Sequence, residues 1–298
     1  MSKISNLSIL LSVLALWLTS FMNSETQIIV AFILIFSFGI VHGANDLLLI
    51  KKINGENSMT YWKILLHYTT IVFIAVILFS LIPWLAMLLF IIVSSYHFGE
   101  QHWDKKIMYP TIFMTKLFHT VYGLFILLLL FQFHEKEVIA VMYGITGIEF
   151  TFISNAALLK IIGFIMVAMF FYNCKTSAIF QKNIAVELLY LLLLAIIFKV
   201  GSLIWAFAIY FIFWHSIPSL IEQIKFLYGE VSTTNSKAYL KAAFIYWFIS
   251  IVGIIVLYFL LKDYKIFDSI FFSFLAAITF PHVIVIERMF ISKNKKTE

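Results

Sequence analysis

Residues 61–103 read YWKILLHYTTIVFIAVILFSLIPWLAMLLFIIVSSYHFGEQHW, and no Asp, Glu, Lys or Arg lies between Lys63 and Glu100. A helix needs about 20 mostly apolar residues to cross the hydrocarbon core of a bilayer. This stretch is long enough for two crossings, and we predict consecutive spans at 61–82 and 84–103. The pattern is typical of an integral membrane protein.

The rest of the chain has the same character. Of its 298 residues, 63% are hydrophobic and only 12% are charged, and the mean hydropathy is +1.02. Soluble globular domains do not reach such values. We predict an all-α, polytopic transmembrane helix bundle, a single integral membrane domain over 1–298, with about ten spans at 5–22, 26–49, 61–82, 84–103, 111–132, 151–173, 184–200, 202–221, 239–261 and 267–290.

The division between the seventh and eighth segments is the least marked in the sequence. Around Lys199 to Ser202 a single long or re-entrant segment competes with two separate spans. Eight or nine spans therefore remain alternatives to ten.

Basic residues indicate the orientation. With ten spans and a cytoplasmic N-terminus, 16 of the 21 Lys and Arg residues face the cytoplasm, and the outer side keeps only Lys136, Lys160, Lys199, Lys262 and Lys265. This is the bias that the positive-inside rule expects. We predict a multi-pass protein of the cell (inner) membrane with both termini cytoplasmic.

The charge and the cysteine content exclude several classes of protein. Lysines that flank membrane segments on the anionic leaflet account for the net charge of +6, so we expect no nucleic-acid partner. The single cysteine, Cys174, excludes an internal disulfide and any site built from several thiolates.

Four histidines lie near the same end of the second, fourth, eighth and tenth segments, all of which run outside to inside in this topology: His42, His97, His215 and His282. They precede the next basic residue by six to ten positions, or roughly 9–15 Å of helix. One layer of the bundle thus contains four imidazoles. An ionisable group inside a membrane is a functional candidate, and we predict a metal site, although histidines that only join helices by hydrogen bonds are the alternative.

Two carboxylates lie close to these histidines in the sequence. Asp46 follows His42 by four residues, and Glu100 follows His97 by one helical turn. Carboxylates of this kind orient a metal-bound imidazole and raise its basicity, although an ordinary acid at a helix end has the same spacing. Prolines stand beside the other two histidines, and we expect kinked or broken helices at Pro218 and Pro281 that border a pocket.

The remaining histidines are weaker candidates. His102 follows His97 by five residues and is an alternative ligand. We expect His67 and His119 to serve packing and His134 to be solvated. Imidazole ligands suit iron, copper, zinc or nickel, and the ligand type alone does not choose among these metals.

The polar motifs occur in a characteristic order: His42-Gly43-Ala44-Asn45-Asp46, Tyr96-His97-Phe98-Gly99-Glu100, Trp214-His215-Ser216 and Thr279-Phe280-Pro281-His282. In these motifs the chain resembles the Brp/Blh (bacteriorhodopsin-related-protein-like) family of membrane β-carotene 15,15'-dioxygenases over nearly its whole length. The resemblance implies a histidine-bound Fe(2+) that uses O2 to cleave β-carotene centrally into two all-trans-retinal. It also implies hand-off of retinal to a microbial rhodopsin, and His42, His97 and His215 as iron ligands.

One position departs from the family pattern. Family members often have a second histidine four residues after the position of His215, where this chain has Ser219. We assign His282 as the fourth ligand, with His102 or a water as the alternative. Tyr96, Phe98 and Trp214, which adjoin the histidines in sequence, are candidates for the substrate pocket.

Two other functions were weighed. A di-iron membrane desaturase or hydroxylase needs clustered HxxxH and HxxHH spacings, and neither spacing occurs here. A histidine-lined transporter or channel for protons or metal ions is the non-enzyme alternative, although we find no convincing internal repeat.

Overall fold

The computed structural model describes residues 3–55, 60–103, 107, 109–148, 155–261 and 267–295, and the residues in these ranges form helices and short connections without a strand. The predicted all-α class is confirmed. By its contacts the chain divides into two compact units. Unit 1 comprises 1–35, 91–140 and 149–218, and unit 2 comprises 36–90, 141–148 and 219–298. The single domain expected from the sequence stays a prediction.

Within the described residues, eight helical stretches are long and apolar enough to cross a membrane: Ser24–Asn54, Tyr61–Leu81, Ile112–Phe133, Asn155–Thr176, Phe180–Val200, Leu203–Tyr228, Thr233–Val256 and Ser273–Lys293. Two further predicted spans are helical but fall outside this set: α1 (Lys3–Thr19), which is shorter, and α6 (Pro83–Trp103), which ends in polar residues. The span count and the orientation of the termini stay predictions. The start of the segment expected at 151–173 lies outside the described residues.

The division near Lys199 is a true helix end. Helix α10 (Ala178–Val200) stops before Gly201, whose backbone is extended, and α11 (Leu203–Ile209) begins two residues later. The single continuous segment considered above is therefore wrong. A helix that we did not predict, α8 (Glu135–Thr146), follows α7.

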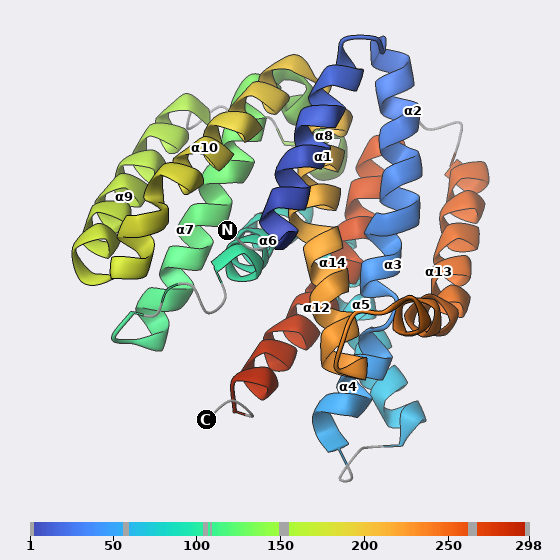
Figure 1. Ribbon diagram of the computed structural model, residues 1–298. Coiled ribbons are helices and arrows are strands. Elements are labelled where there is room, and N and C mark those ends of the chain that lie inside the picture. The colour runs from blue at the N-terminus through green and yellow to red at the C-terminus, as the bar shows by residue number, and fades with distance from the viewer. Residues whose placement is uncertain are drawn as a thin grey trace. The chain divides into compact units, whose positions relative to one another are not determined.

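Unit 1 contains α1, α2 (Ser24–Leu34), the second part of α6, α7 (Ile112–Phe133), α9 (Asn155–Thr176), α10 and α11. Helices α9 and α10 pack against α7 and against each other, as Figure 1 shows, and α11 packs on α2. Glycines let α6 and α7 touch backbone to backbone. A Cβ atom at Gly99 would overlap the main-chain carbonyl of His119, and one at Gly123 would overlap that of Ser95.

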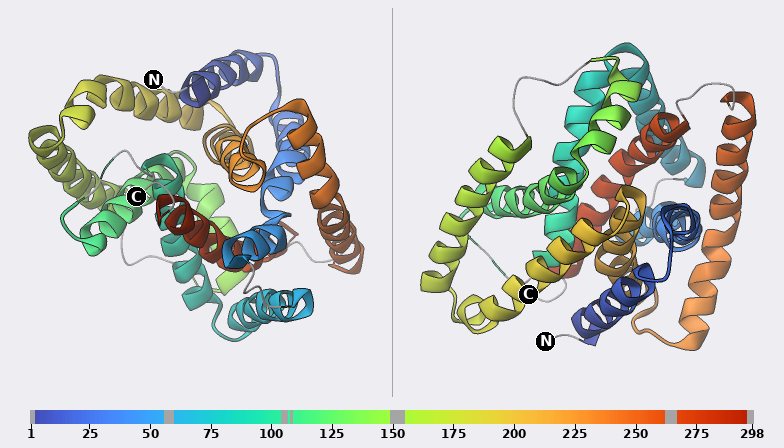
Figure 2. Two further views of the ribbon diagram at one scale, coloured as in Figure 1. Left: turned by 60° about the horizontal axis from the view of Figure 1, so that its bottom comes forward. Right: turned by 90° about the horizontal axis from the view of Figure 1, so that it is seen from above.

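Unit 2 contains α3 (Ile40–Gly43), α4 (Asp46–Asn54), α5 (Tyr61–Leu81), α12 (Ile217–Tyr228), α13 (Thr233–Leu261) and α14 (Phe267–Lys295), with Ile217 and Pro218 belonging to unit 1. Helix α14 packs along α5 and α4 (Figure 2). Leu49, Ile286 and Met289 are fully buried at this contact. Helix α13 packs on α3, so the short helix that carries His42 is covered from a second side.

Two π-helical turns interrupt these helices close to histidines. The first, η1 (Ile35–Gly39), leads into α3, and the second, η3 (Tyr210–Ser216), contains His215. Wider π turns change the backbone pairing, and serine hydroxyls bind two carbonyls of η3: Ser216 Oγ donates to Phe211 at 2.8 Å, and Ser8 Oγ donates to Phe213 at 2.6 Å. Such turns are frequent at functional sites.

The prolines do not break their helices. Helix α12 continues through Pro218, and α14 continues through Pro281. Neither proline ends its helix, and a kink at Pro218 or Pro281 stays a prediction. The irregular backbone lies just before Pro218, in η3, where serine hydroxyls bind carbonyls that a regular helix would pair with the main chain.

Large apolar side chains remain exposed along several helices. On α9, Phe164 is 78% exposed and Phe171 is 63% exposed, and on α5 Phe73 is 65% exposed. Large apolar side chains exposed in this way are unfavourable in water and suit lipid. Together with the eight apolar helices it indicates a multi-pass membrane protein.

Candidate metal centre

In unit 1, α6 and η3 bring two histidines together. The ring centroids of His97 and His215 are 4.6 Å apart, with the ring planes at 75°. The two residues are 1% and 2% exposed. Two candidate nitrogen ligands thus pack edge to face, away from water.

Aromatic rings surround this pair. Phe98 meets the ring of His215 at 4.8 Å, and Phe211 stacks on it at 5.6 Å. Phe98 also packs against Tyr210 at 5.4 Å. The ring of Phe98, a predicted pocket residue, thus touches a candidate ligand.

In unit 2, the turn between α3 and α4 meets α14, and a second histidine pair forms. The rings of His42 and His282 lie 4.9 Å apart and perpendicular to each other. His42 is 5% exposed and His282 is 4% exposed. The ring of His282 packs against Gly43, where an added Cβ would lie in ordinary contact with Nδ1 at 3.6 Å.

The protons on these two rings are held by specific acceptors. His282 Nδ1 lies 2.9 Å from Asp46 Oδ1, and His42 Nδ1 hydrogen-bonds the carbonyl of Gly39, the last residue of η1. When Nδ1 donates its proton, the lone pair of a neutral imidazole is on Nε2. Both rings are therefore prepared to bind a metal through Nε2.

Asp46 itself is fixed by a tyrosine. Tyr68 Oη on α5 donates to Asp46 Oδ2 at 2.9 Å. Hydrogen bonds link Tyr68 to Asp46 and Asp46 to His282, and the side chains of Asp46 and His282 are buried. It matches the carboxylate–histidine arrangement that orients metal ligands in proteins.

The second predicted carboxylate has a different contact. Glu100 Oε1 accepts a hydrogen bond of 2.6 Å from the hydroxyl of Tyr96, one turn earlier on α6. Tyr96 in turn packs near His119, with ring centroids 6.2 Å apart. The structure therefore joins Glu100 to Tyr96.

His102, the alternative ligand, bonds to a buried acid. Its Nε2 lies 2.7 Å from Glu187 Oε2 on α10, and its ring stacks on Tyr122 at 5.0 Å. This pair links α6 to α10 inside unit 1. The carboxylate therefore engages Nε2 of His102.

The last candidate for the pocket, Trp214, faces neighbouring helices. Its indole Nε1 donates to Ser12 Oγ on α1 at 2.8 Å, and its ring packs against Tyr190 at 5.0 Å. Its position in η3, next to His215, does not place its polar edge beside the histidine pair.

The three weaker histidines divide differently from our expectation. His119 is buried, as expected for packing, whereas His67 is exposed and its Nδ1 donates to the carbonyl of Lys63 on its own helix. His134 was expected to be solvated, and this is wrong. It is 6% exposed, and its Nε2 donates to the carbonyl of Phe198 at 2.8 Å.

Sequence reasoning missed three residues around the unit 2 pair: Tyr68, Gln223 and Tyr239. Gln223 Nε2 donates to the main-chain carbonyl of His42 at 2.8 Å, and Tyr239 Oη lies 3.3 Å from the same oxygen. The available signal was their polarity, since hydrogen-bonding side chains in apolar spans usually face the interior of a bundle.

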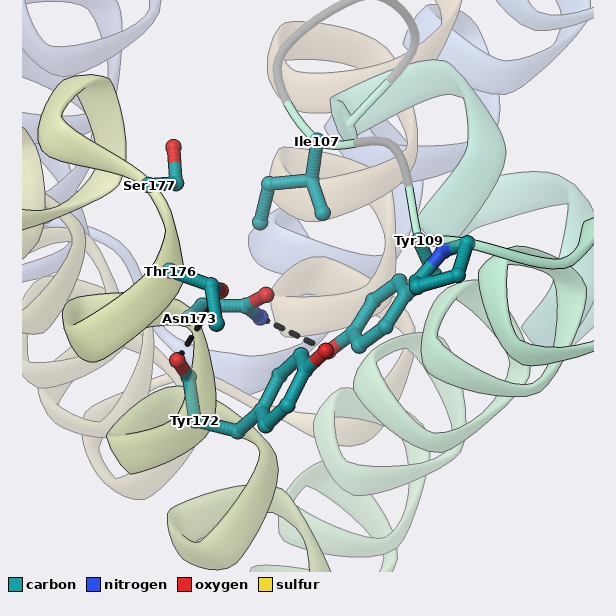
Figure 3. A pocket seen from close by; sticks show the side chains of 7 residues that line it. Ile107, Tyr109, Tyr172, Asn173, Thr176 and Ser177 are labelled. Carbon is teal, nitrogen blue, oxygen red and sulfur yellow. Dashed lines mark hydrogen bonds between the residues drawn. The ribbon is translucent and has the colours of Figure 1, made fainter.

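A cavity of about 410 Å³ lies elsewhere in unit 1 and is shown in Figure 3. Tyr109 and Tyr172 stack at its edge with centroids 5.6 Å apart, and Asn173 Nδ2 donates to the hydroxyl of Tyr109 at 2.8 Å. None of the predicted site residues lines it.

Comparison with known proteins places the chain in a family. Searches of curated proteins and of solved structures found no match. A scan against family models found one match, described as beta-carotene 15,15'-dioxygenase, over residues 33–290. This range includes all four candidate ligands together with Asp46, Tyr68 and Gln223. The chain belongs to the β-carotene 15,15'-dioxygenase family.

Proposed function

We propose that this protein cleaves β-carotene at its central double bond with O2 and releases two molecules of all-trans-retinal, using a histidine-bound iron(II). Family membership implies β-carotene dioxygenase activity. The observation that carries the iron-dependent mechanism is the pair of oriented, buried imidazoles at His42 and His282, each with Nδ1 held by an acceptor.

The proposed ligands are His42, His97, His215 and His282. Three of them, His42, His215 and His282, are buried and have the donor chemistry to hold one metal ion. An all-nitrogen, neutral donor set suits iron(II), and the chain has no second cysteine to offer a thiolate site.

Helix η3, which carries His215, and helix α12, which carries Gln223, are neighbours in the sequence. Helix α12 follows η3 without a gap, so His215 and Gln223 lie eight residues apart on one helical rod, about 12 Å. Gln223 is the residue that binds the main chain of His42. The chain thus runs directly from His215 in η3 to Gln223 in α12, the residue that binds the main chain of His42.

Iron(II), when bound by these histidines, would supply the O2 chemistry. The residues of this chain do the rest. Gly39 and Asp46 hold protons on Nδ1 of His42 and His282, which keeps both Nε2 lone pairs available. Phe98 and Phe211 provide apolar surface beside His215, against which we place the polyene and from which water is excluded.

Cleavage at the centre then depends on how the polyene is aligned with the metal site. A carotene is comparable in length to the hydrocarbon core, about 30 Å. The ligand layer must therefore meet the midpoint of the polyene for the two products to be equal. Each carbon of the central double bond gains one oxygen atom from O2, so the reaction needs no further reductant or oxidant.

We place the enzyme in the cell membrane, where both the substrate and the product dissolve. Retinal leaving the site would enter the same bilayer, and hand-off to a microbial rhodopsin is the proposed use of the product. The lipid-exposed aromatic surface of α5 and α9 is compatible with this location.

The direct test is expression in a bacterial host that makes β-carotene. The pigment should bleach under air and retinal should accumulate, as measured by chromatography. His97→Ala and His215→Ala should abolish iron binding and retinal formation together. His67→Ala is the matched control, since His67 is exposed and its Nδ1 hydrogen-bonds the carbonyl of Lys63 on its own helix.

Unchanged pigment at good expression would contradict the proposal. The transporter alternative is tested with purified protein in liposomes. Proton or metal flux, without retained iron and without carotene conversion, would favour transport.

A further inference from the structure

The main-chain carbonyl of His42 is a group that needs a partner. Helix α3 has four residues, and the last four carbonyls of any helix have no partner within that helix. A buried carbonyl without a hydrogen bond costs about 1–3 kcal/mol. Two neighbouring helices meet the need at His42: Gln223 on α12 donates at 2.8 Å, and Tyr239 on α13 approaches to 3.3 Å.

The amide of Gln223 is fully engaged. Its Nε2 donates to the His42 carbonyl and to Ser219 Oγ at 3.0 Å, while its Oε1 accepts from Tyr239 Oη at 2.7 Å. A flipped amide would set its oxygen against the His42 carbonyl, which also only accepts. The tyrosine proton, committed to Oε1 by the shorter distance, therefore fixes which amide atom faces His42.

The network is closed to water. Ser219, Gln223 and Tyr239 have no exposed surface. Asn45 strengthens it, because its Nδ2 donates to the Tyr239 carbonyl at 3.0 Å and so joins the turn after His42 to α13. In a buried setting each of these hydrogen bonds is geometrically demanding, since an unmade bond is not replaced by water.

We propose that Gln223 is a positioning residue of the metal centre, which sets the place of the His42 ring by holding its backbone. The inference rests on the proposed function. The ring of His42 is tied at Nδ1 to Gly39, and its main chain is tied to Gln223, so both ends of the residue are fixed. Metal ligands must be held within about 0.5 Å of their productive geometry.

The same geometry gives a role to Ser219, the position where family members often have a histidine. Its hydroxyl accepts from Gln223, one turn further along α12. Position 219 in this chain thus acts on the metal centre through Gln223 and His42.

The test uses the full-length protein in detergent and follows the metal itself. Gln223→Leu removes every hydrogen bond of the amide at nearly constant volume. Affinity for Fe(II) is measured by competition with a chromophoric chelator, and ligand geometry by the visible spectrum of the Co(II)-substituted protein. We expect affinity to fall about 10- to 100-fold and the Co(II) spectrum to change.

Gln27→Leu is the matched control. Gln27 is also buried, and it bonds the main chain of Ser202 and Met22 in unit 1. Its replacement should lower the unfolding temperature and leave Fe(II) affinity and the Co(II) spectrum as in the wild type. A structural role alone would make the two variants alike.

Milder variants cover the case in which Gln223→Leu does not fold. Tyr239→Phe and Ser219→Ala keep the Gln223 side chain but release the amide from its fixed orientation, and both should alter the Co(II) spectrum. A wild-type spectrum and wild-type Fe(II) affinity in every folded variant would overturn the inference. A wild-type protein that binds no metal would instead overturn the proposed function, and the inference with it.

Discussion

The imidazole Nδ1 of His282 lies 2.9 and 3.0 Å from the two carboxylate oxygens of Asp46, a residue 236 positions earlier in the chain. An ionised carboxylate only accepts hydrogen bonds, so it keeps the proton of His282 on Nδ1 and the lone pair on Nε2. Tyr68 binds one of the same oxygens and prevents the carboxylate from rotating.

Replacing Asp46 with asparagine tests this relationship at constant size. The amide can turn its NH2 group toward Nδ1, which favours the tautomer with the proton on Nε2, where the metal should bind. We expect Fe(II) affinity to fall about 10- to 100-fold, as for other residues that orient metal ligands. Iron content after purification and chelator competition measure the effect.

Tyr68→Phe is a milder change at the same hydrogen-bond network. It removes one hydrogen bond to the carboxylate and leaves the Asp46–His282 contact, so its effect should be smaller than that of Asp46→Asn. Equal iron affinity in wild type and Asp46→Asn would show that Asp46 does not control His282.

His282 and His102 are the two histidine candidates for the fourth iron ligand, and alanine variants of each distinguish between them. His282→Ala should lower iron content, because it removes a buried nitrogen, Nε2, that we propose binds the metal. His102→Ala should keep iron but lower the unfolding temperature, since it leaves the Glu187 carboxylate buried without its histidine. Breaking one partner of a buried pair typically costs about 3–5 kcal/mol.

Iron content and thermal unfolding in detergent, measured on both variants, decide the assignment. Loss of iron in His102→Ala at unchanged stability would exchange the roles of the two histidines. His102→Ala combined with Glu187→Leu should recover part of the lost stability, because the buried carboxylate that lost its histidine is then removed as well.

The helical fold was predictable because hydrophobic runs of membrane-spanning length are an unambiguous signal in a chain of this composition. The break at Gly201 was also visible, as a short polar interruption around Lys199. The π turns η1 and η3 were not, since their sequences, Ile35–Gly39 and Tyr210–Ser216, have no proline and no distinctive pattern of polarity.

The candidate ligands were predictable as a set, whereas the groups that orient them were not. Because Asp46 follows His42 by four residues, we expected the two side chains to share one helix face. Helix α3 ends at Gly43 and α4 begins at Asp46, so they do not. The acid instead meets His282 through tertiary packing. Similarly, Glu100 bonds Tyr96, four residues away, because that spacing aligns the two side chains on α6.

Two glycines should be essential for the helix pair that carries His97. An alanine Cβ at Gly99 or Gly123 would overlap a main-chain carbonyl of the facing helix, and backbone cannot move aside as a flexible side chain can. We expect Gly99→Ala and Gly123→Ala to lower the yield of folded protein and the unfolding temperature sharply. The measurement is size-exclusion chromatography and thermal unfolding in detergent.

Gly253→Ala on α13 is the control for this prediction. No heavy atom lies within 4 Å of a Cβ added there, and alanine stabilises a helix interior by about 0.5–1 kcal/mol relative to glycine. This variant should be as stable as the wild type or slightly more stable. Normal folding of Gly99→Ala would contradict the close contact between α6 and α7.

Tyr109 should make the stability of the protein sensitive to high pH. Burial raises the pKa of Tyr109 from 10.0 to about 12, although the hydrogen bond from Asn173 opposes the shift. Because the unfolded chain loses this proton first, stability should fall as pH rises from about 10 toward 12. Thermal unfolding of wild type and Tyr109→Phe across this range isolates the contribution, since the other tyrosines are common to both. The variant should lose less stability than the wild type between the two pH values, and parallel losses would show that Tyr109 ionises alike in the folded and unfolded chains.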